Sequence, residues 1–246
     1  MADSRATSFG AEASSYEAGR PEYPFHAVAW MLDILPAGAH RIADVGAGTG
    51  KLTRALADAP RAEIVAIDPD PGMLEALRAA VPGVPTFLGT AEELPLPDAS
   101  VDAVVLGQAW HWVDAAAASR EIGRVVRPGG ALGLIWNVRD ERTEWVRALT
   151  EIMHPSAAEE MLREGDPLVG LPFGAVESES WEWSREINRE QLHRLASSRS
   201  AVITASDEEK ARIRREMDAL FDDLGLQNGT IALPYVTRAF RATRET

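Results

Sequence analysis

Short apolar runs alternate with stretches of helical periodicity through the first 140 residues of the chain. Apolar runs bounded by turn residues predict buried strands, and these lie at 41–45, 63–67, 84–88, 101–106 and 131–136. Apolar residues three and four positions apart predict helices, and these lie at 24–35, 51–58, 71–80 and 115–127, the last stopped by Pro128-Gly129-Gly130. Because strands that alternate with helices form βαβ units, this part of the chain predicts a parallel sheet.

The pattern changes after residue 140. Helices are predicted at 142–164, 189–199 and 207–224, and strands at 175–187 and 230–241, the second of them interrupted by Pro234. The late strands carry more polar residues than the early ones, which is typical of an antiparallel edge. The chain is therefore predicted to be α/β, with a Rossmann-like, doubly wound sheet of seven strands. We expect this sheet to be mostly parallel, with an antiparallel last strand and helical lid insertions.

The expected organisation is a single domain over residues 1–246. It has a core at about 36–140, an N-terminal cap at 1–35, and insertions on the substrate side at about 137–174 and 188–228. The length agrees with this, because α/β folds reach about 250 residues as one unit.

Composition narrows the choice of partners. The chain carries 25 Lys and Arg against 38 Asp and Glu, a net charge of −13, whereas nucleic acids require a basic surface. We therefore expect no nucleic-acid partner. The apolar content of 46% supports a folded core, and the absence of cysteine excludes disulfides and thiolate metal sites.

No window approaches 18 uncharged apolar residues, and residues 1–9 lack the apolar stretch of a signal peptide. We expect a cytoplasmic protein without membrane insertion. A monomer and a homodimer are both open.

A glycine-rich turn, Asp44-Val-Gly-Ala-Gly-Thr-Gly50, follows the first predicted strand and opens a helix. Glycines permit close approach of a ligand to the backbone, and a helix N-terminus favours a negative group. A P-loop is rejected because Leu52 stands where its Ser or Thr is required, and the dinucleotide pattern fails because Lys51 replaces its third glycine. Two interpretations remain: the loop that binds S-adenosylmethionine (SAM) in class I methyltransferases, and a turn without a ligand.

Asp68 ends the second predicted strand, 22 residues after Gly46. A carboxylate at this place can accept two hydrogen bonds from a ribose diol. NAD enzymes use the same arrangement, so Asp68 does not choose between the cofactors. Because it precedes Pro69, a turn residue or a helix cap is the alternative.

Four motifs follow in order: Asp44–Gly50, Ile67–Leu74, Gly89–Pro95 and Glu121–Gly130. In this order and spacing, over about residues 9–140, the chain resembles the class I SAM-dependent methyltransferases. The resemblance is to their small-molecule branch, related to ubiquinone/menaquinone and trans-aconitate methyltransferases. It implies SAM as the cofactor and a small molecule as the methyl acceptor.

The same resemblance implies which residues contact SAM. They are Gly46, Gly48 and Thr49 in the glycine loop, Asp68 at the ribose, Met73, Ala91 and Glu92 at the adenine, Gln108 at the methionyl end, and Tyr16 and Arg20 in an N-terminal segment that closes over the cofactor. Arg20 can pair with the methionine carboxylate. The alternative, which the sequence supports equally, is that Arg20 is a surface arginine without a role in SAM binding.

The reacting end is less clearly marked. Methyl transfer from a sulfonium loses charge, so the protein mainly holds the nucleophile in line, and a base is needed only if a proton must leave. His111, within Trp110-His111-Trp112, is the candidate base, and a histidine that orders the loop is the alternative. Trp110 and Trp112 are candidate pocket walls or core residues. The five histidines lack metal-ligand spacing, so no metal is expected.

Further candidates for the acceptor pocket come from later in the chain. Trp136, Asn137 and Arg139 end the fifth predicted strand and are expected to face the same crevice. Asn137 would orient a polar acceptor. Arg139 would bind a carboxylate or else pair with its acidic neighbours on the surface. Tyr23 and Tyr235 are additional candidates for the pocket wall.

The leading hypothesis is a SAM-dependent methyltransferase that moves the sulfonium methyl group to a small-molecule acceptor by in-line displacement. A non-catalytic SAM-binding or partner-binding domain is one alternative. An NAD-dependent oxidoreductase is the other, and the glycine spacing, Glu92 and the motif at 127–130 disfavour it. The sequence predicts neither the acceptor nor which of O, N, C or S is methylated.

Overall fold

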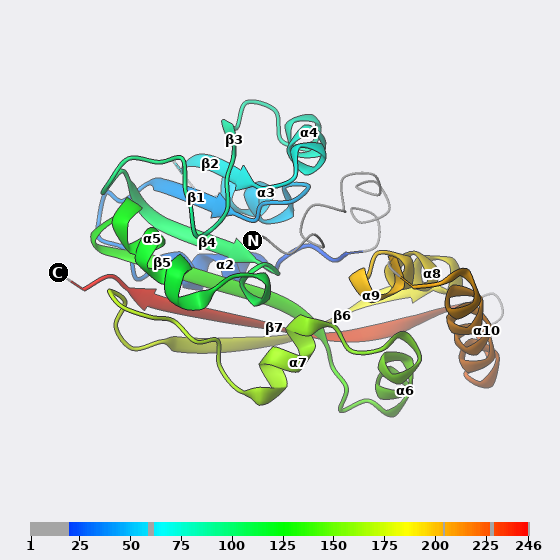
Figure 1. Cartoon of the computed structure of the whole chain (residues 1–246). Coiled ribbons are helices and arrows are strands. Elements are labelled where there is room, and N and C mark those ends of the chain that lie inside the picture. The colour runs from blue at the N-terminus through cyan, green and yellow to red at the C-terminus, as the bar shows by residue number, and fades with distance from the viewer. Residues whose placement is uncertain (1–19, 59–61, 204, 227–228, 246) are drawn as a thin grey trace.

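The computed structural model of the chain describes residues 20–58, 62–203, 205–226 and 229–245 (Figure 1). Within these residues, seven strands form one sheet in the order β3-β2-β1-β4-β5-β7-β6. The strands are β1 (Arg41–Val45), β2 (Glu63–Asp68), β3 (Thr86–Leu88), β4 (Val101–Gly107), β5 (Val126–Arg139), β6 (Glu177–Asn188) and β7 (Thr230–Thr243). Neighbours among β1 to β5 are parallel, whereas β7 runs antiparallel to both β5 and β6. The predicted α/β sheet of seven strands is confirmed.

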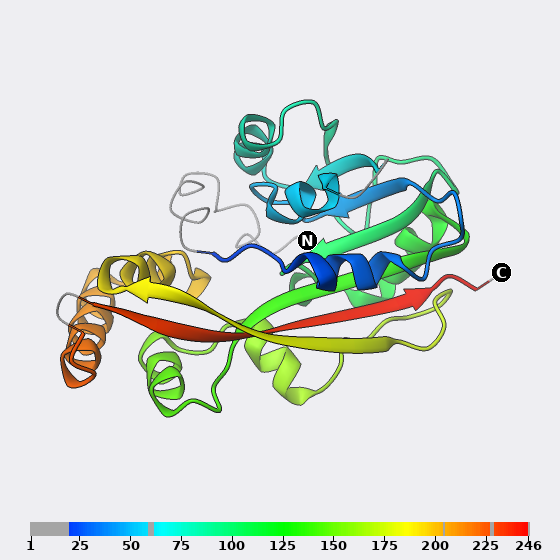
Figure 2. The ribbon, with the colours of Figure 1, turned by 180° about the vertical axis from the view of Figure 1, so that it is seen from behind.

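Helices cover both faces of the sheet. They are α2 (Phe25–Leu32), α3 (Lys51–Ala57), α4 (Pro71–Ala80), α5 (Ala115–Val125), α6 (Glu144–Met153), α7 (Ala157–Glu164), α8 (Arg189–Ser197), α9 (Ser200–Ile203), α10 (Asp207–Asp223) and the 3₁₀ helix η2 (Trp110–Trp112). Figure 2 shows α2 in front of the strands, on the face opposite to α5. None of the helices in the described ranges has the length and apolar character that a bilayer span requires.

The central strands are apolar on both sides because both sides are buried. Val105 of β4 packs into a core with α2 and α3, while its neighbour Val104 packs into the core on the α5 side. Successive strand residues point to opposite faces, so a strand buried on both faces reads as a continuous apolar run. This is why 101–106 was recognisable as a strand.

The predicted bounds of two helices are wrong. The helix expected to reach residue 127 ends at Val125, and β5 begins at Val126, which already pairs with Val101 of β4. The helix expected over 142–164 is two helices, because Pro155 cannot continue α6 and Ser156 begins α7 as its N-cap.

The predicted interruption of the last strand at Pro234 is also wrong. β7 continues through Pro234, which pairs with Ser184 of β6. Its carbonyl accepts a hydrogen bond from the backbone N–H of Asp140, one residue beyond the end of β5. Because the N and O of a residue in an antiparallel strand point to the same side, the missing N–H faces a place where the β5 ladder has already ended. The strand loses only the reciprocal bond to Asp140, beyond the last residue with which β5 pairs.

A second apolar core lies at one end of the sheet. β7 pairs with β5 only from Tyr235 onward, so residues 230–234 pair with β6 alone and the two strands extend beyond β5. Figure 1 shows α6, α8, α9 and α10 gathered around this extension. Apolar side chains fill the space between them, including Leu149, Met217 and Phe221.

The second core makes a prediction about stability. Phe221 is 1% exposed, and truncating a buried phenylalanine typically costs about 3–5 kcal/mol. We expect Phe221→Ala to lower the free energy of unfolding by about that amount, measured by urea denaturation. The control Phe25→Ala removes a ring that is 65% exposed and should change stability by less than about 0.5 kcal/mol. Equal effects of the two changes would contradict this assignment of the core.

Candidate active site at the carboxyl ends of β1 and β4

The glycine loop connects β1 to α3 and uses backbone conformations that other residues rarely adopt. Gly46, Gly48 and Gly50 have φ values of +67°, +55° and +92°. A Cβ at Gly46 would lie 2.7 Å from Cβ of Ala109, whereas a Cβ at Gly48 would meet nothing within 4 Å. Gly46 therefore permits close packing, and Gly48 leaves space at its side of the loop.

Asp68 holds this loop from the end of β2. Its Oδ2 accepts a hydrogen bond of 2.8 Å from the backbone N–H of Gly48, and its Oδ1 accepts one of 2.8 Å from that of Asp70. Burial raises the pKa of Asp68 to about 6, although the two backbone hydrogen bonds oppose the rise. The cap of α4 is Asp70, which accepts from the N–H groups of Gly72 and Met73. Asp68 thus ends β2 and is not the cap of the helix.

Asp44, the last polar residue of β1, is buried with one oxygen unsatisfied. Its Oδ2 accepts a 2.6 Å hydrogen bond from Oγ1 of Thr53, and its Oδ1 is buried without a hydrogen-bond partner among the described residues. Burial raises the pKa of Asp44 to about 7, the Thr53 hydroxyl opposes the rise, and the charge of Asp68 adds to it. A buried acceptor of this kind is costly unless a donor or a cation reaches it.

Two neighbouring cavities lie at this edge of the sheet. The first, which we call the loop cavity, encloses about 450 Å³ including its open mouth and is lined by Arg20, Pro21, Tyr23, Asp44, Gly46, Ala47, Gly48, Thr49, Lys51, Leu52, Gly107 and Gln108. The second, the arginine cavity, encloses about 400 Å³ on the same measure and is lined by Arg20, Pro21, Gln108, Asn137, Val138, Arg139, Ser156, Ala158, Glu159, Leu195, Arg199 and Tyr235. They meet at the residues common to both, Arg20, Pro21 and Gln108.

Arg20 and Pro21 line both cavities and Tyr23 lines the loop cavity, and Glu22 fixes the position of this segment. Oε1 of Glu22 accepts hydrogen bonds from Lys51 (3.0 Å) and Arg54 (2.9 Å) of α3. The carbonyl of Glu22 accepts one of 3.0 Å from Asn137 of β5. The hydroxyl of Tyr23 lies so close to Gly107 that a Cβ there would be 2.7 Å from it. Sequence reasoning selected Arg20 and Tyr23 from this segment but missed Glu22.

Gln108, which follows β4, lines both cavities, and Asn137 of β5 lines the arginine cavity. Gln108 has a φ of +57°, which is uncommon outside glycine, and its Nε2 donates a 2.9 Å hydrogen bond to the carbonyl of Asn137. Oδ1 of Asn137 accepts from Oγ1 of Thr237 at 2.6 Å, and Thr237 in turn accepts from the indole N–H of Trp183 at 2.8 Å. The side-chain amide of Asn137 is therefore fixed between the carbonyl of Glu22 and the hydroxyl of Thr237, and its backbone carbonyl holds Gln108.

The two cavities are lined neither by the residues of η2, which are Trp110, His111 and Trp112, nor by Trp136 of β5. Trp110 is 3% exposed and donates its indole N–H to the carbonyl of Leu168, and Trp136 is completely buried. The indole N–H of Trp136 donates to Nδ1 of His111 at 3.4 Å, and the ring of Trp112 lies 4.8 Å from that of His111. Burial, with a smaller contribution from the charge of Arg20, lowers the pKa of His111 to about 3.

The remaining candidates lie in different places. Met73 and Ala91 are buried, and Glu92 accepts a 2.9 Å hydrogen bond from the backbone N–H of Asp114, the N-cap of α5. These three residues line neither of the two cavities. Tyr16 lies outside the described residues.

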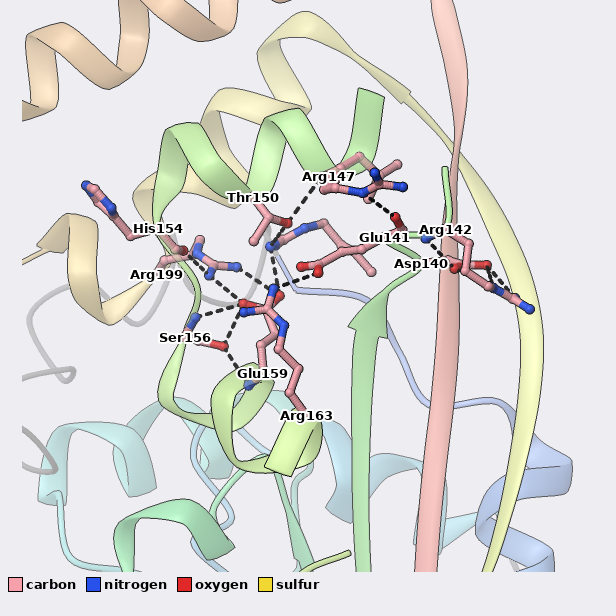
Figure 3. A network of polar contacts seen from close by, with 12 residues as sticks. Asp140, Glu141, Arg142, Arg147, Thr150, His154, Ser156, Glu159, Arg163 and Arg199 are labelled. Atoms are coloured by element: carbon pink, nitrogen blue, oxygen red, sulfur yellow. Dashed lines mark hydrogen bonds and ion pairs between the residues drawn. The ribbon is translucent and has the colours of Figure 1, made fainter. Parts of the chain in front are cut away.

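A buried ionic cluster forms one side of the arginine cavity (Figure 3). Nη2 of Arg139 donates to Oε1 of Glu159 at 2.7 Å and to Oγ1 of Thr150 at 3.0 Å. Nη2 of Arg199 donates to Oε2 of Glu159 at 2.8 Å. Although burial alone would raise it, the charges of Arg139 and Arg199 hold the pKa of Glu159 well below its usual range. Arg139 was predicted to face this crevice, but Glu159 and Arg199 were not recognised.

The chain is similar to known methyltransferases over nearly its whole length. A family profile described as a methyltransferase domain matches residues 43–134. An uncharacterized methyltransferase of Mycobacterium tuberculosis is 47% identical, with 96% of this chain and 95% of the relative covered. An uncharacterized methyltransferase-like protein of Schizosaccharomyces pombe is 36% identical over the same shares of the two chains.

A solved structure from Anaeromyxobacter dehalogenans, described provisionally as a type II methyltransferase, has the same fold. It superposes with a TM-score of 0.66 at 25% identity, covering 92% of this chain and 97% of that one.

The buried Asp44 carboxylate predicts how stability depends on pH. Its folded pKa of about 7 exceeds the ordinary value of 3.8, so its contribution to stability is lost as the pH rises toward 7. Asp44→Asn removes this ionisation. We expect the difference in unfolding free energy, variant minus native protein, to increase by on the order of a few kcal/mol between about pH 4 and 7. Both proteins are measured without ligand.

Asp102 supplies a control of opposite sign. Burial by itself would raise the pKa of Asp102. Hydrogen bonds from the backbone N–H groups of Arg41 and His40 and from the side chain of Arg127 outweigh burial and lower this pKa. Its ionisation stabilises the fold, and that contribution is lost as the pH falls through its folded pKa. Asp102→Asn should therefore lose stability relative to the native protein at neutral pH, and lose less in acid. A constant difference between Asp44→Asn and the native protein would contradict the assignment for Asp44.

Proposed function

Because the chain belongs to the SAM-dependent methyltransferases, we propose that the loop cavity holds SAM and that the arginine cavity holds a small-molecule acceptor. The observation that carries this proposal is the meeting of the two cavities at Gln108. Group transfer requires donor and acceptor to lie side by side in one orientation. A cavity that only bound the cofactor would not need this second space.

The residues of the loop cavity fit the chemical groups of SAM. The buried, unsatisfied Oδ1 of Asp44 suits the ammonium group of the methionine part. Gly48 leaves space beside the loop, and Asp68 stands at the end of β2, where a carboxylate can accept from ribose hydroxyls. We assign Gly46, Thr49 and Arg20 to the methionine part as well.

The adenine is assigned to the side of the site formed by the loops after β2 and β3. Met73 lies in the first turn of α4, the helix that follows β2, and Ala91 and Glu92 follow β3. Glu92 joins this side to the start of α5 through its hydrogen bond to Asp114. Tyr16 stays a prediction.

SAM, when bound, supplies a methyl group on a positively charged sulfur. The protein's own part is to orient the acceptor and to exclude water. Gln108, fixed by its bond to Asn137, stands between the two cavities and is assigned to the reacting end. Tyr235 and Asn137 contribute polar groups to the acceptor side.

His111 is proposed to position the loop and not to act as a general base. A group whose pKa is lowered to about 3 accepts a proton from an acceptor hydroxyl or amine only at a large free-energy cost at neutral pH. Its Nδ1 already accepts from Trp136. An acceptor atom that is already deprotonated, or that carries no proton, would make such a base unnecessary.

The assignment of Asp68 is tested by binding of S-adenosylhomocysteine. A hydrogen bond to a charged group contributes roughly 1.5–3 kcal/mol, so Asp68→Ala should weaken binding about tenfold or more in isothermal titration. Asp70→Ala is the matched control, because Asp70 caps the adjacent helix. Its loss should cost about 1 kcal/mol of stability and leave the affinity unchanged. Unchanged affinity in Asp68→Ala, or no binding by the native protein, would contradict the proposal.

The positioning role of His111 is tested by nuclear magnetic resonance. Because its pKa is lowered to about 3, its ring should stay neutral between pH 5 and 8, with the proton on Nε2 and a free electron pair on Nδ1 accepting from Trp136. The ¹⁵N shifts of the imidazole report both the charge and the tautomer. A ring that takes up a proton near pH 6.5 would restore His111 as a candidate base.

A further inference from the structure

The arginine cavity contains more buried positive than negative charge. Arg139 and Arg199 are 7% and 5% exposed, and both donate to the single carboxylate of Glu159, which is 9% exposed. These three side chains together carry a charge of +1. Glu159 is the acidic side chain among the described residues that line this cavity, while Arg20 adds a third guanidinium group to it. The surplus stands in a protein whose net charge is −13.

Buried charge without a counterion is expensive, and the proximity of the two guanidinium groups adds to the cost. Burial, and after it the charge of Arg139, lowers the pKa of Arg199 to about 10. Arg199 therefore remains charged at neutral pH. A protein tolerates such a pair more readily when an anion enters the cavity and completes the charge balance.

Hydrogen-bond donors at the cavity are also left unused. Arg139 bonds to Glu159 and Thr150 through its Nη2 atom. The Nε atoms of Arg139 and Arg199 have no hydrogen-bond partner among the described residues. The hydroxyl of Tyr235, on a side chain that is 3% exposed, donates no hydrogen bond among the described residues, while the charge of Arg185 lies near it. Figure 3 shows that other polar groups around Glu159, such as Ser156, are turned toward its carboxylate. The spare donors belong to the arginines and the tyrosine.

We propose that the methyl acceptor carries a carboxylate and that Arg139, Arg199 and Tyr235 bind this group in the arginine cavity. The proposal rests on the proposed function, which places the acceptor in this cavity. Arg20 is assigned to the methionine part of SAM, so the surplus left for the acceptor is the +1 of Arg139, Arg199 and Glu159. A carboxylate carries one charge, which matches it, and its two oxygens suit the planar guanidinium fork. A phosphate dianion would exceed the surplus.

Binding to the native protein is the first part of the test. The probes are benzoate and hexanoate, with benzamide and hexanamide as uncharged analogues and phenyl phosphate as the dianion. Each is titrated into protein saturated with S-adenosylhomocysteine. We expect a carboxylate to bind at least about tenfold more tightly than its amide and more tightly than the phosphate. Equal binding of acid and amide, no binding of either acid, or a preference for the phosphate would overturn the proposal.

Substitutions identify the residues responsible. Arg139→Gln should weaken carboxylate binding about 10- to 100-fold while the affinity for S-adenosylhomocysteine, which reports the fold, is kept. Arg139→Lys keeps the charge without the guanidinium fork and replaces the Gln variant in the test if that variant does not fold. Its carboxylate affinity should lie between those of the native protein and Arg139→Gln. Arg163→Gln is the matched control, because Arg163 lies on the same helix as Glu159 but pairs with Glu141. Unchanged carboxylate binding in both Arg139 variants would contradict the assignment.

Glu159→Gln separates a binding role from a purely structural one. Glutamine can keep the capping box with Ser156, but the change raises the charge of the cluster from +1 to +2. We expect carboxylates to bind more tightly and phenyl phosphate to gain the most. A loss of thermal stability without any gain in anion binding would assign the cluster to structure alone. Failure of the native protein to bind S-adenosylhomocysteine would instead count against the proposed function.

Discussion

The reversal of strand order between β1 and β4 determines where this protein can hold ligands. The chain builds β1, β2 and β3 outward in one direction and then returns to place β4 on the other side of β1. The connections after β1 and β4 therefore leave the sheet toward opposite faces and open a crevice at the carboxyl ends. The glycine loop follows β1 and Gln108 follows β4. Both lie at this crevice, together with Arg20, Pro21 and Tyr23.

The length of the last two strands determines the second half of the site. β6 and β7 extend past the end of β5 and carry four helices with an apolar core of their own. Tyr235 stands where β7 leaves β5, opposite Arg139 at the last paired position. Arg199 follows α8, whose Leu195 both packs into the second core and lines the arginine cavity. The packing of that core thereby fixes the position of one wall of the cavity.

The sequence predicted those features that depend on local pattern. The strands of the first half, the loop Asp44–Gly50 and Asp68 are each marked by neighbours a few residues away. Glu22, Glu159 and Arg199 were missed because their partners lie far along the chain. In the sequence, Glu159 is one acidic residue within a predicted helix. It gains its importance from Arg139, 20 positions before it, and Arg199, 40 positions after it. Periodicity likewise did not decide which of Trp110 and Trp112 is buried, because a short 3₁₀ turn sets their directions.

The two cavities draw on different stretches of the chain, and they touch only through Arg20, Pro21 and Gln108. The loop cavity is built from residues 20–23, 44–52 and 107–108, while most of the arginine cavity comes from residues 137–235. With the proposed assignment of donor and acceptor, mutations in the later stretch alter acceptor choice while the methyl-donor pocket stays intact. Such an arrangement lets a lineage diversify its chemistry by changing one half of a gene, and it offers protein engineers a boundary at which to exchange specificity.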